Sequence, residues 1–403
     1  MIDVYVGRQN IFNATLSTCS YEIKYYTDGE GGNVVGRNTI SSALSILQTV
    51  IDIGIEKITQ GKPAIFNLTG DFIVKQKTLP FQPDIGGILL NANDDEINDT
   101  LIRTVSRLGQ KKYQVIFDQV RINRYTVSLL HEIHFGRIDW NAYTQPEIQS
   151  LIQQLKQYDV HLIIENIPGH EQFEAAKKLG AEYFQGNFFT QPNIIQGKRL
   201  PSRRLFVLKM LASLYNPEID IRDLEIIIKQ DVSLGYKLMR MVNSAYYGLN
   251  SQIESIQHAL VLLGINPLRS WLSVLLLSEI DDQPIPLMST AIIRGKMCEL
   301  LGELSQEKDT SSYFVTGLFS ILDSMIGMPM TDILDTIPMS DKIYQALLQH
   351  EGNLGKTLQS VIAYEQNNWQ QINLPKVTIQ QIREAYLKSI AWATELANSN
   401  LLK

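Results

Sequence analysis

Acidic and amide side chains follow the apolar runs in the first half of the chain, one at the end of nearly every run. The positions are Glu22 within Tyr21–Lys24, Asn67 after Ala64–Phe66, Asp118 after Val115–Phe117, Glu165 after Leu162–Ile164, and Gln185 after Tyr183 and Phe184. Hard oxygen ligands at strand ends are how an α/β barrel gathers Mg²⁺ or Mn²⁺ at one rim. The pattern therefore indicates a metal-dependent site, or what remains of one.

The composition restricts the kinds of protein that the chain can be. Its 403 residues favour two or three domains, and 44% hydrophobic with 19% charged residues is typical of a globular protein. The apolar runs fall short of the roughly 20 residues that cross a bilayer. The two cysteines, Cys19 and Cys298, fit a reducing compartment, and the net charge of −6 disfavours a nucleic-acid surface. We expect a cytoplasmic protein with neither membrane nor nucleic acid as partner.

Eight strand-like runs alternate with amphipathic stretches over residues 1–195. They are Asp3–Gly7, Ser20–Tyr25, Ala64–Asn67, Gly87–Leu90, Gln114–Phe117, Arg137–Asp139, His161–Glu165 and Tyr183–Gln185. Two helices are predicted over Ser41–Thr59 and Thr144–Tyr158, the second opening with a capping box, Thr144 to Glu147. This alternation favours a parallel sheet closed into a small (β/α)₈ TIM-like barrel.

Helical periodicity replaces the strand pattern in the rest of the chain. A segment with two prolines and a glycine, Gln191 to Pro201, reads as an interdomain linker. From Ser202 onward apolar stripes recur at three- and four-residue spacing. We therefore predict a multidomain α/β and all-α protein: a barrel over residues 1–195 and a helical domain over residues 196–403.

The first half resembles the EAL family of cyclic di-GMP phosphodiesterases, which have a modified (β/α)₈ barrel. The segment from Gly180 to Pro192, which contains Gln185 and Gly186, follows the family's closing strand. Tyr21–Lys24 occupies the place of the motif that names the family and keeps its glutamate, Glu22. The resemblance implies that Glu22, Asn67, Asp118 and Glu165 stand at metal-ligand positions.

Three departures from the family pattern weaken the implied metal site. Asn91 stands where the family has a third-strand glutamate, Gln119 replaces one aspartate of a pair, and Arg137 replaces a lysine. Two-metal hydrolysis needs about four carboxylates around both cations. We therefore expect the retained ligand positions to be vestigial, with no catalytic residue, no bound metal and no cofactor.

The second half resembles the HDOD domain, a helical relative of the HD phosphohydrolases that lacks their metal ligands. The residues that carry this resemblance run from Asp231 through Asn243 to Gly248, and from Ile253 through Ala259 to Gly264. An active HD site needs a His-Asp dipeptide, and none occurs in the chain. The chain as a whole thus resembles the EAL–HDOD two-domain family.

The resemblance implies a catalytically inactive bacterial signalling protein in cyclic di-GMP, motility or biofilm regulation. Its partners would be other signalling proteins, bound through the HDOD domain, the barrel or both, and EAL barrels commonly form homodimers. One alternative is a receptor that binds cyclic di-GMP without hydrolysing it, through Gln185 and Arg137. Another is a weakly active phosphodiesterase with an unusual ligand set.

Overall fold

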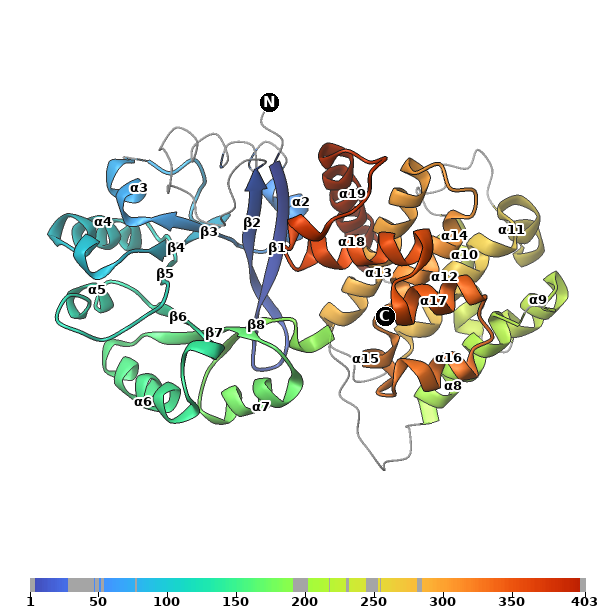
Figure 1. Ribbon diagram of the computed structural model, residues 1–403, viewed down its shortest axis with the longest axis horizontal. Helices are drawn as coiled ribbons and strands as arrows, with labels where there is room; N and C mark the ends of the chain where they lie inside the picture. The colour runs from blue at the N-terminus through green and yellow to red at the C-terminus, as the bar shows by residue number, and fades with distance from the viewer. Residues whose placement is uncertain are drawn as a thin grey trace. The chain divides into compact units, whose positions relative to one another are not determined.

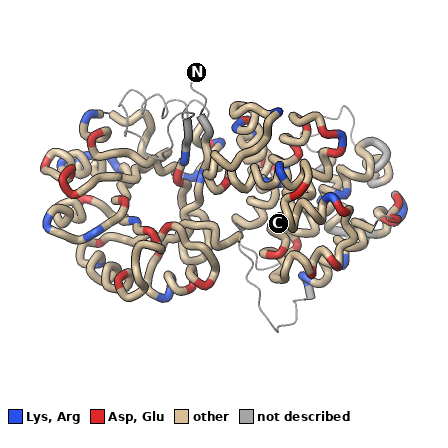
Figure 2. The backbone as a smooth tube through the Cα atoms, in the orientation of Figure 1, with Lys and Arg blue, Asp and Glu red and all other residues tan. Residues whose placement is uncertain are grey.

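The computed structural model of the chain divides into two compact units, Met1–Gln191 and Pro192–Lys403 (Figure 1). It describes residues 4–27, 47, 51, 54–76, 78–190, 202–216, 218–229, 232–243, 253, 255–280 and 285–398. The predicted linker and the predicted domain boundary at 195/196 lie outside these residues. Lys and Arg are interspersed with Asp and Glu along both units (Figure 2).

Eight strands in sequence order close the first unit into a barrel. They are β1 (Val4–Asn13), β2 (Thr18–Thr27), β3 (Ala64–Thr69), β4 (Gly86–Asn91), β5 (Val115–Phe117), β6 (Phe135–Asp139), β7 (His161–Ile167) and β8 (Tyr183–Gly186). Each corresponds to one predicted strand, so the predicted barrel is confirmed.

The first strand departs from the predicted parallel arrangement. β1 runs antiparallel to both of its neighbours, β2 and β8, whereas β2 to β8 pair in parallel. Only four residues join β1 to β2, too few for the crossover that parallel strands need. The Asn13 side chain holds this turn by accepting hydrogen bonds from the backbone N–H groups of Thr15 and Ser17. The parallel sheet predicted from the strand–helix alternation is therefore confirmed for β2 to β8, whereas β1 is antiparallel.

An apolar cluster fills the inside of the barrel. Its members are Ile11, Ile65, Leu89, Ile116 and Ile163, with Phe135 and Tyr183 packed against them. Side chains two residues apart on a strand point to the same face. The residues two positions further along the strands therefore form the next interior layer, and these are Asn67, Asn91, Asp118, Arg137, Glu165 and Gln185. The alternation of the strands thus gathers the predicted site at the carboxyl end of the barrel.

Short helices connect the strands. They are α2 (Ile55–Thr59), α3 (Gly70–Lys75), α4 (Asp99–Gln110), α5 (Val127–Leu130), α6 (Gln145–Leu155) and α7 (His170–Lys178). The capping box predicted at the start of α6 is present, since Glu147 accepts hydrogen bonds from the backbone N–H and the hydroxyl of Thr144. Most of the other predicted helix, Ser41–Thr59, lies outside the described residues, and its last turn is α2.

The second unit forms helices and no strand among its described residues. Its helices are α8 (Ser202–Leu214), α9 (Ile221–Lys229), α10 (Val232–Val242), α11 (Ile256–Leu263), α12 (Ile265–Ser278), α13 (Ile285–Leu304), α14 (Thr310–Phe319), α15 (Leu322–Ile326), α16 (Met330–Thr336), α17 (Asp341–Gln349), α18 (Gly352–Glu365) and α19 (Ile379–Asn398). None of the described helices in either unit is long and apolar enough to span a membrane.

Helices from the middle and the end of the second unit share one core. On α19, the Trp392 ring lies 5.1 Å from the Trp271 ring of α12 and 5.8 Å from the Phe314 ring of α14. Arg294 of α13, which is buried, donates to Glu365 at the end of α18 at 2.8 Å. The last two helices, α18 and α19, are therefore packed into one core with α12, α13 and α14.

Candidate functional site

The predicted site residues come together inside the barrel. Glu22, Asn67, Asp118, Arg137, Glu165 and Gln185 are all buried, although each is polar or charged. A buried charge must be paired to be tolerated in a protein interior. The way in which these groups are paired therefore decides what the site can do.

Arg137 of β6 is the centre of this arrangement. Its Nη1 lies 2.7 Å from Glu22 Oε2 of β2 and 3.1 Å from Glu165 Oε2 of β7, while its Nε donates to Asp118 Oδ1 at 2.9 Å. Burial alone would lower the pKa of Arg137. The attraction of the three carboxylates outweighs this effect and raises that pKa. One guanidinium thus joins carboxylates from three strands.

Glu22 is fully buried and accepts from three donors. Lys24 Nζ donates to Oε1 at 2.6 Å, and Arg137 Nη1 and Gln185 Nε2 both donate to Oε2, at 2.7 and 2.6 Å. Burial alone would raise the pKa of Glu22, but Arg137, Lys24 and Gln185 outweigh it and lower that pKa to about 2. Glu22 is therefore an ionised structural anion at physiological pH.

Glu165 has the opposite electrostatic environment. Burial raises its pKa to about 7, and the negative charges of Glu22 and Asp118 add to this effect, which Arg137 and Lys24 only partly offset. The three carboxylates share two cations, so one negative charge is in excess. Glu165 is the carboxyl that takes up a proton in response.

Asn91 and Gln119, at the two positions where the resemblance implies carboxylates, are amide donors. Asn91 Nδ2 donates to Asp118 Oδ2 at 3.4 Å, and Gln119 Nε2 donates to Glu165 Oε1 at 3.5 Å. The amides face the remaining carboxylates and add weak hydrogen bonds where further carboxylates would add repulsion. Asn91 and Gln119 therefore suit a site without metal.

The arrangement does not fit a divalent metal ion. Each of the three carboxylates is in contact with Arg137, and among the described residues no three acidic, histidine or cysteine side chains are placed to hold a metal. One hard oxygen stays available: Asn67 Oδ1 is buried and has no hydrogen-bond partner among the described residues. A single amide oxygen is far from the six or more ligands that Mg²⁺ or Ca²⁺ prefers.

Two contacts of the site were not predicted from the sequence. Lys24 forms an ion pair with Glu22, and Gln9 of β1 accepts a hydrogen bond from Gln185 Nε2 at 3.0 Å. The period of two on β2 places Lys24 on the same face as Glu22, and this signal could have identified it. Gln9 could not be identified this way, because the antiparallel course of β1 was not expected.

Gly186 ends β8 in a conformation that only glycine adopts readily. Its φ is +153°, and a Cβ atom there would lie 2.3 Å from the carbonyl oxygen of Ile167. We expect Gly186→Ala to lower the free energy of unfolding by more than about 1 kcal/mol, because it adds both strain and overlap. Urea unfolding checks this, with Gly61→Ala as control, since Gly61 also has positive φ but has open space around it. Equal losses in both variants would show that φ alone matters.

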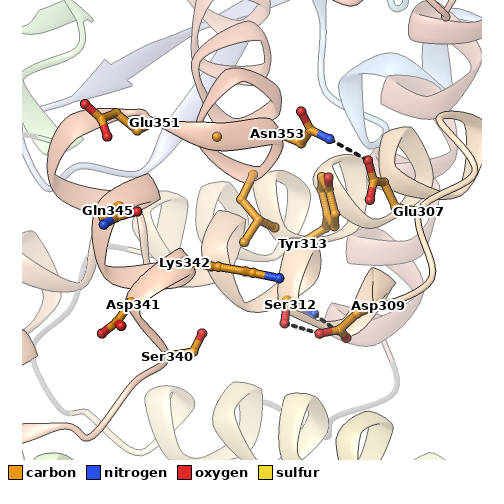
Figure 3. Close-up of a pocket in the computed structure, with 12 residues that line it drawn as sticks. Glu307, Asp309, Ser312, Tyr313, Ser340, Asp341, Lys342, Gln345, Glu351 and Asn353 are labelled. Carbon is orange, nitrogen blue, oxygen red and sulfur yellow. Dashed lines mark hydrogen bonds between the residues drawn. The ribbon is translucent and has the colours of Figure 1, made fainter.

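The second unit contains a cavity of about 720 Å³ near the N-termini of α14, α17 and α18 (Figure 3). Its lining includes Asp309, Asp341 and Glu351, which lie at or next to the caps of these three helices. Carboxylates at helix N-termini stabilise the helix dipole. In Figure 3 Asp341 and Glu351 point away from the middle of the cavity. Asp309 caps α14 by accepting a hydrogen bond from the Ser312 backbone N–H, and the charges of Asp341 and Glu351 stabilise the dipoles of α17 and α18.

Comparison with known proteins covers both units. Residues 200–334 match the family model of the HDOD domain. Over 98% of its length the chain is 27% identical to the uncharacterized protein YuxH of Bacillus subtilis, covering 99% of that protein. Over the same share it is 24% identical to a Vibrio cholerae protein, the cyclic di-GMP phosphodiesterase CdgJ, covering 94% of it.

Solved structures match the barrel at low similarity. One is BlrP1 of Klebsiella pneumoniae with calcium and cyclic di-GMP, at 14% identity and a TM-score of 0.38, covering 47% of this chain and 56% of that one. The helical domain predicted from the sequence is confirmed by the family match, and the barrel by its eight strands. The chain therefore combines an eight-stranded barrel with an HDOD domain that follows it in the sequence, and it is similar over nearly its whole length to a protein named a cyclic di-GMP phosphodiesterase.

Proposed function

We propose that the chain is a catalytically inactive signalling protein that acts by binding other proteins in a cyclic di-GMP circuit. The observation that supports the proposal most is Arg137, whose guanidinium contacts Glu22, Asp118 and Glu165 at 2.7 to 3.1 Å. Metal-assisted phosphodiester hydrolysis uses such carboxylates to hold cations that activate water and stabilise the phosphate. Carboxylates that are engaged by an arginine cannot serve that purpose at the same time.

The relatives of the chain suggest that it acts in cyclic di-GMP signalling. Its two domains suggest that it acts by binding other proteins. The V. cholerae relative is named a cyclic di-GMP phosphodiesterase, and the similarity extends over both units. A barrel that no longer hydrolyses the nucleotide would still present a folded surface, and the HDOD domain a second one. Binding to a partner through either surface then transmits the signal.

Complementation of a deletion strain tests whether catalysis is needed. We expect Glu165→Gln to restore motility or biofilm mass as well as the unaltered chain does, because a scaffold needs the barrel fold and not its carboxylates. Glu171→Gln, which changes an exposed glutamate of the same unit, is the matched control, and immunoblots verify equal amounts of protein. Loss of complementation by Glu165→Gln alone would favour an enzyme.

Two other functions each have one observation in their favour. Hydrolysis is favoured by the name of the V. cholerae relative. Binding of cyclic di-GMP without hydrolysis is favoured by Asn67 Oδ1, a buried acceptor without a partner among the described residues, which a ligand N–H group could satisfy. Formation of linear product distinguishes the first from the second.

A further inference from the structure

We infer that the barrel unit has a binding site for a small organic anion, a phosphate or carboxylate group on an apolar body, between α3 and α4. These helices lie side by side, and a cavity of about 360 Å³ lies between them, a volume within the range of small-molecule sites (Figure 1). Its lining includes Pro83, just before β4, and Tyr113, just before β5. The cavity is therefore near the amino ends of these strands, away from the polar layer around Arg137, and the inference does not depend on the proposed function.

Two cations line the cavity without an opposing charge. Arg107 lies in the last turn of α4 and Lys111 is its C-cap, and neither side chain has an ion pair or hydrogen bond with the described residues. The described lining contains no aspartate or glutamate. Two like charges four residues apart on a helix repel each other. An anionic group bound between them removes that repulsion, and a guanidinium binds phosphate or carboxylate through two parallel hydrogen bonds.

The end of α4 does not require these two side chains as caps. Positive side chains near a helix C-terminus stabilise the helix dipole and can also donate to the last carbonyl groups. In α4 the carbonyl oxygen of Arg107 already accepts from the backbone N–H of Lys111 at 3.2 Å, and that of Leu108 accepts from Tyr113 at 3.0 Å. A favourable interaction with the dipole needs only the nearby charge. The donors of both side chains therefore stay available to a ligand.

Neutral donors line the same cavity. Amide and hydroxyl side chains come from three lining residues, Gln76, Thr78 and Gln82. None of these side chains has a hydrogen bond to a described residue. An ionised carboxylate or phosphate oxygen accepts several hydrogen bonds, so amide N–H and hydroxyl groups complement the two cations.

The rest of the wall favours a ligand with an apolar body over a bare inorganic ion. Ile73 of α3 and Leu108 of α4 are buried residues of the lining. The ring of Tyr113 also lines the cavity, and its hydroxyl donates to the carbonyl oxygen of Phe81 at 2.6 Å. Burial and the charge of Asp84, an exposed residue outside the lining, raise the pKa of Tyr113. The ring is therefore neutral at physiological pH and offers an aromatic surface to the ligand.

Calorimetric titration of the full chain with phenyl phosphate tests the inference. We expect phenyl phosphate to bind at least tenfold more tightly than inorganic phosphate, because only the organic ion contacts the apolar wall. Benzyl alcohol, which has the ring without the charge, should not bind. We also expect the affinity for phenyl phosphate to fall as NaCl is added, because salt screens the attraction of the exposed cations. Benzoate in the same titration shows whether the site prefers carboxylate to phosphate.

Arg107→Gln and Lys111→Gln are each expected to weaken the binding of phenyl phosphate at least tenfold. Arg103→Gln is the matched control, because it removes an exposed arginine of the same helix that does not line the cavity. This control should bind as the unaltered chain does. All three positions are exposed, so we expect each variant to fold, and circular dichroism checks this.

Two kinds of result would overturn the inference. One is that the unaltered chain binds neither phenyl phosphate nor benzoate, or binds benzyl alcohol equally well, and this comparison needs no variant. The other is that Arg107→Gln and Lys111→Gln bind phenyl phosphate as tightly as Arg103→Gln does. Cleavage of cyclic di-GMP by the chain would contradict the proposed function alone, because it concerns the opposite end of the barrel.

Discussion

Glu22→Gln is expected to lower the free energy of unfolding by about 3–5 kcal/mol at neutral pH, the typical loss when one partner of a buried ion pair is removed. Both carboxylate oxygens of Glu22 accept hydrogen bonds, and all three neighbouring groups are donors: Lys24, Arg137 and Gln185. The amide of a glutamine would turn a donor toward one of them. Two buried cations would also lose their common anion.

The pH dependence of the same variant gives an independent check. The pKa of Glu22 is about 2 in the folded chain against an ordinary value of 4.5. The stabilisation by Glu22 is therefore present above pH 4.5 and lost as the pH falls toward 2. Urea unfolding at pH 7 measures the loss in Glu22→Gln, with Glu171→Gln as control. A loss below about 1 kcal/mol would mean that Glu22 does not anchor the cations.

Glu165→Gln is expected to do the opposite and to stabilise the chain above pH 7. The folded state holds the proton of Glu165 up to about pH 7, whereas the unfolded state releases it near 4.5. The unaltered chain therefore loses unfolding free energy as the pH rises from 4.5 to 7, by an amount on the order of 3 kcal/mol. A glutamine has no such proton to lose, and its carbonyl can still accept from Arg137.

The measurement is the free energy of unfolding at pH 5 and pH 8. We expect the difference between the two to be smaller in Glu165→Gln by about 2–3 kcal/mol. Glu171→Gln should change as the unaltered chain does, because Glu171 is exposed. An unchanged pH dependence in Glu165→Gln would show that Glu165 is ionised throughout this range and that Arg137 balances it.

The barrel and the position of its polar layer could be predicted from the sequence. Each strand alternates, so an apolar residue such as Ile116 fixes the face of the residue two positions on, Asp118. The carboxyl ends of β2 to β8 meet at one rim, which is why Glu22, Glu165 and Gln185 were expected together. The strands and the position of the polar layer both follow from the periodicity of the backbone, which is visible in the sequence as alternating apolar and polar residues.

The pairing within the layer could not be predicted in the same way. A side chain as long as that of Arg137 can extend into the barrel or toward a bound phosphate, and the sequence does not fix its rotamer. The resemblance to the EAL family implied a possible phosphate contact for Arg137, whereas the structure places the guanidinium on three carboxylates. The contact with Gln9 depended in addition on the antiparallel β1, which the strand count alone did not reveal.

The helical unit illustrates a different limit. Apolar stripes predicted its helices and its all-α class. The resemblance of the motif around Asn243 indicated the HDOD domain, and the family match confirms it. Packing of Trp392 against Trp271 and Phe314 joins residues far apart in the chain, and helical periodicity does not specify such pairs. The same holds for the surface that a partner protein would contact.

The most direct test of the central claim is calorimetric titration of the full chain with cyclic di-GMP in the presence of Mn²⁺, followed by chromatography of the same sample. If Arg137 occupies the carboxylates, neither heat of binding at micromolar nucleotide nor linear product is expected. Linear product would contradict the claim and identify an enzyme. Binding without product would also contradict the scaffold proposal and identify a cyclic di-GMP receptor.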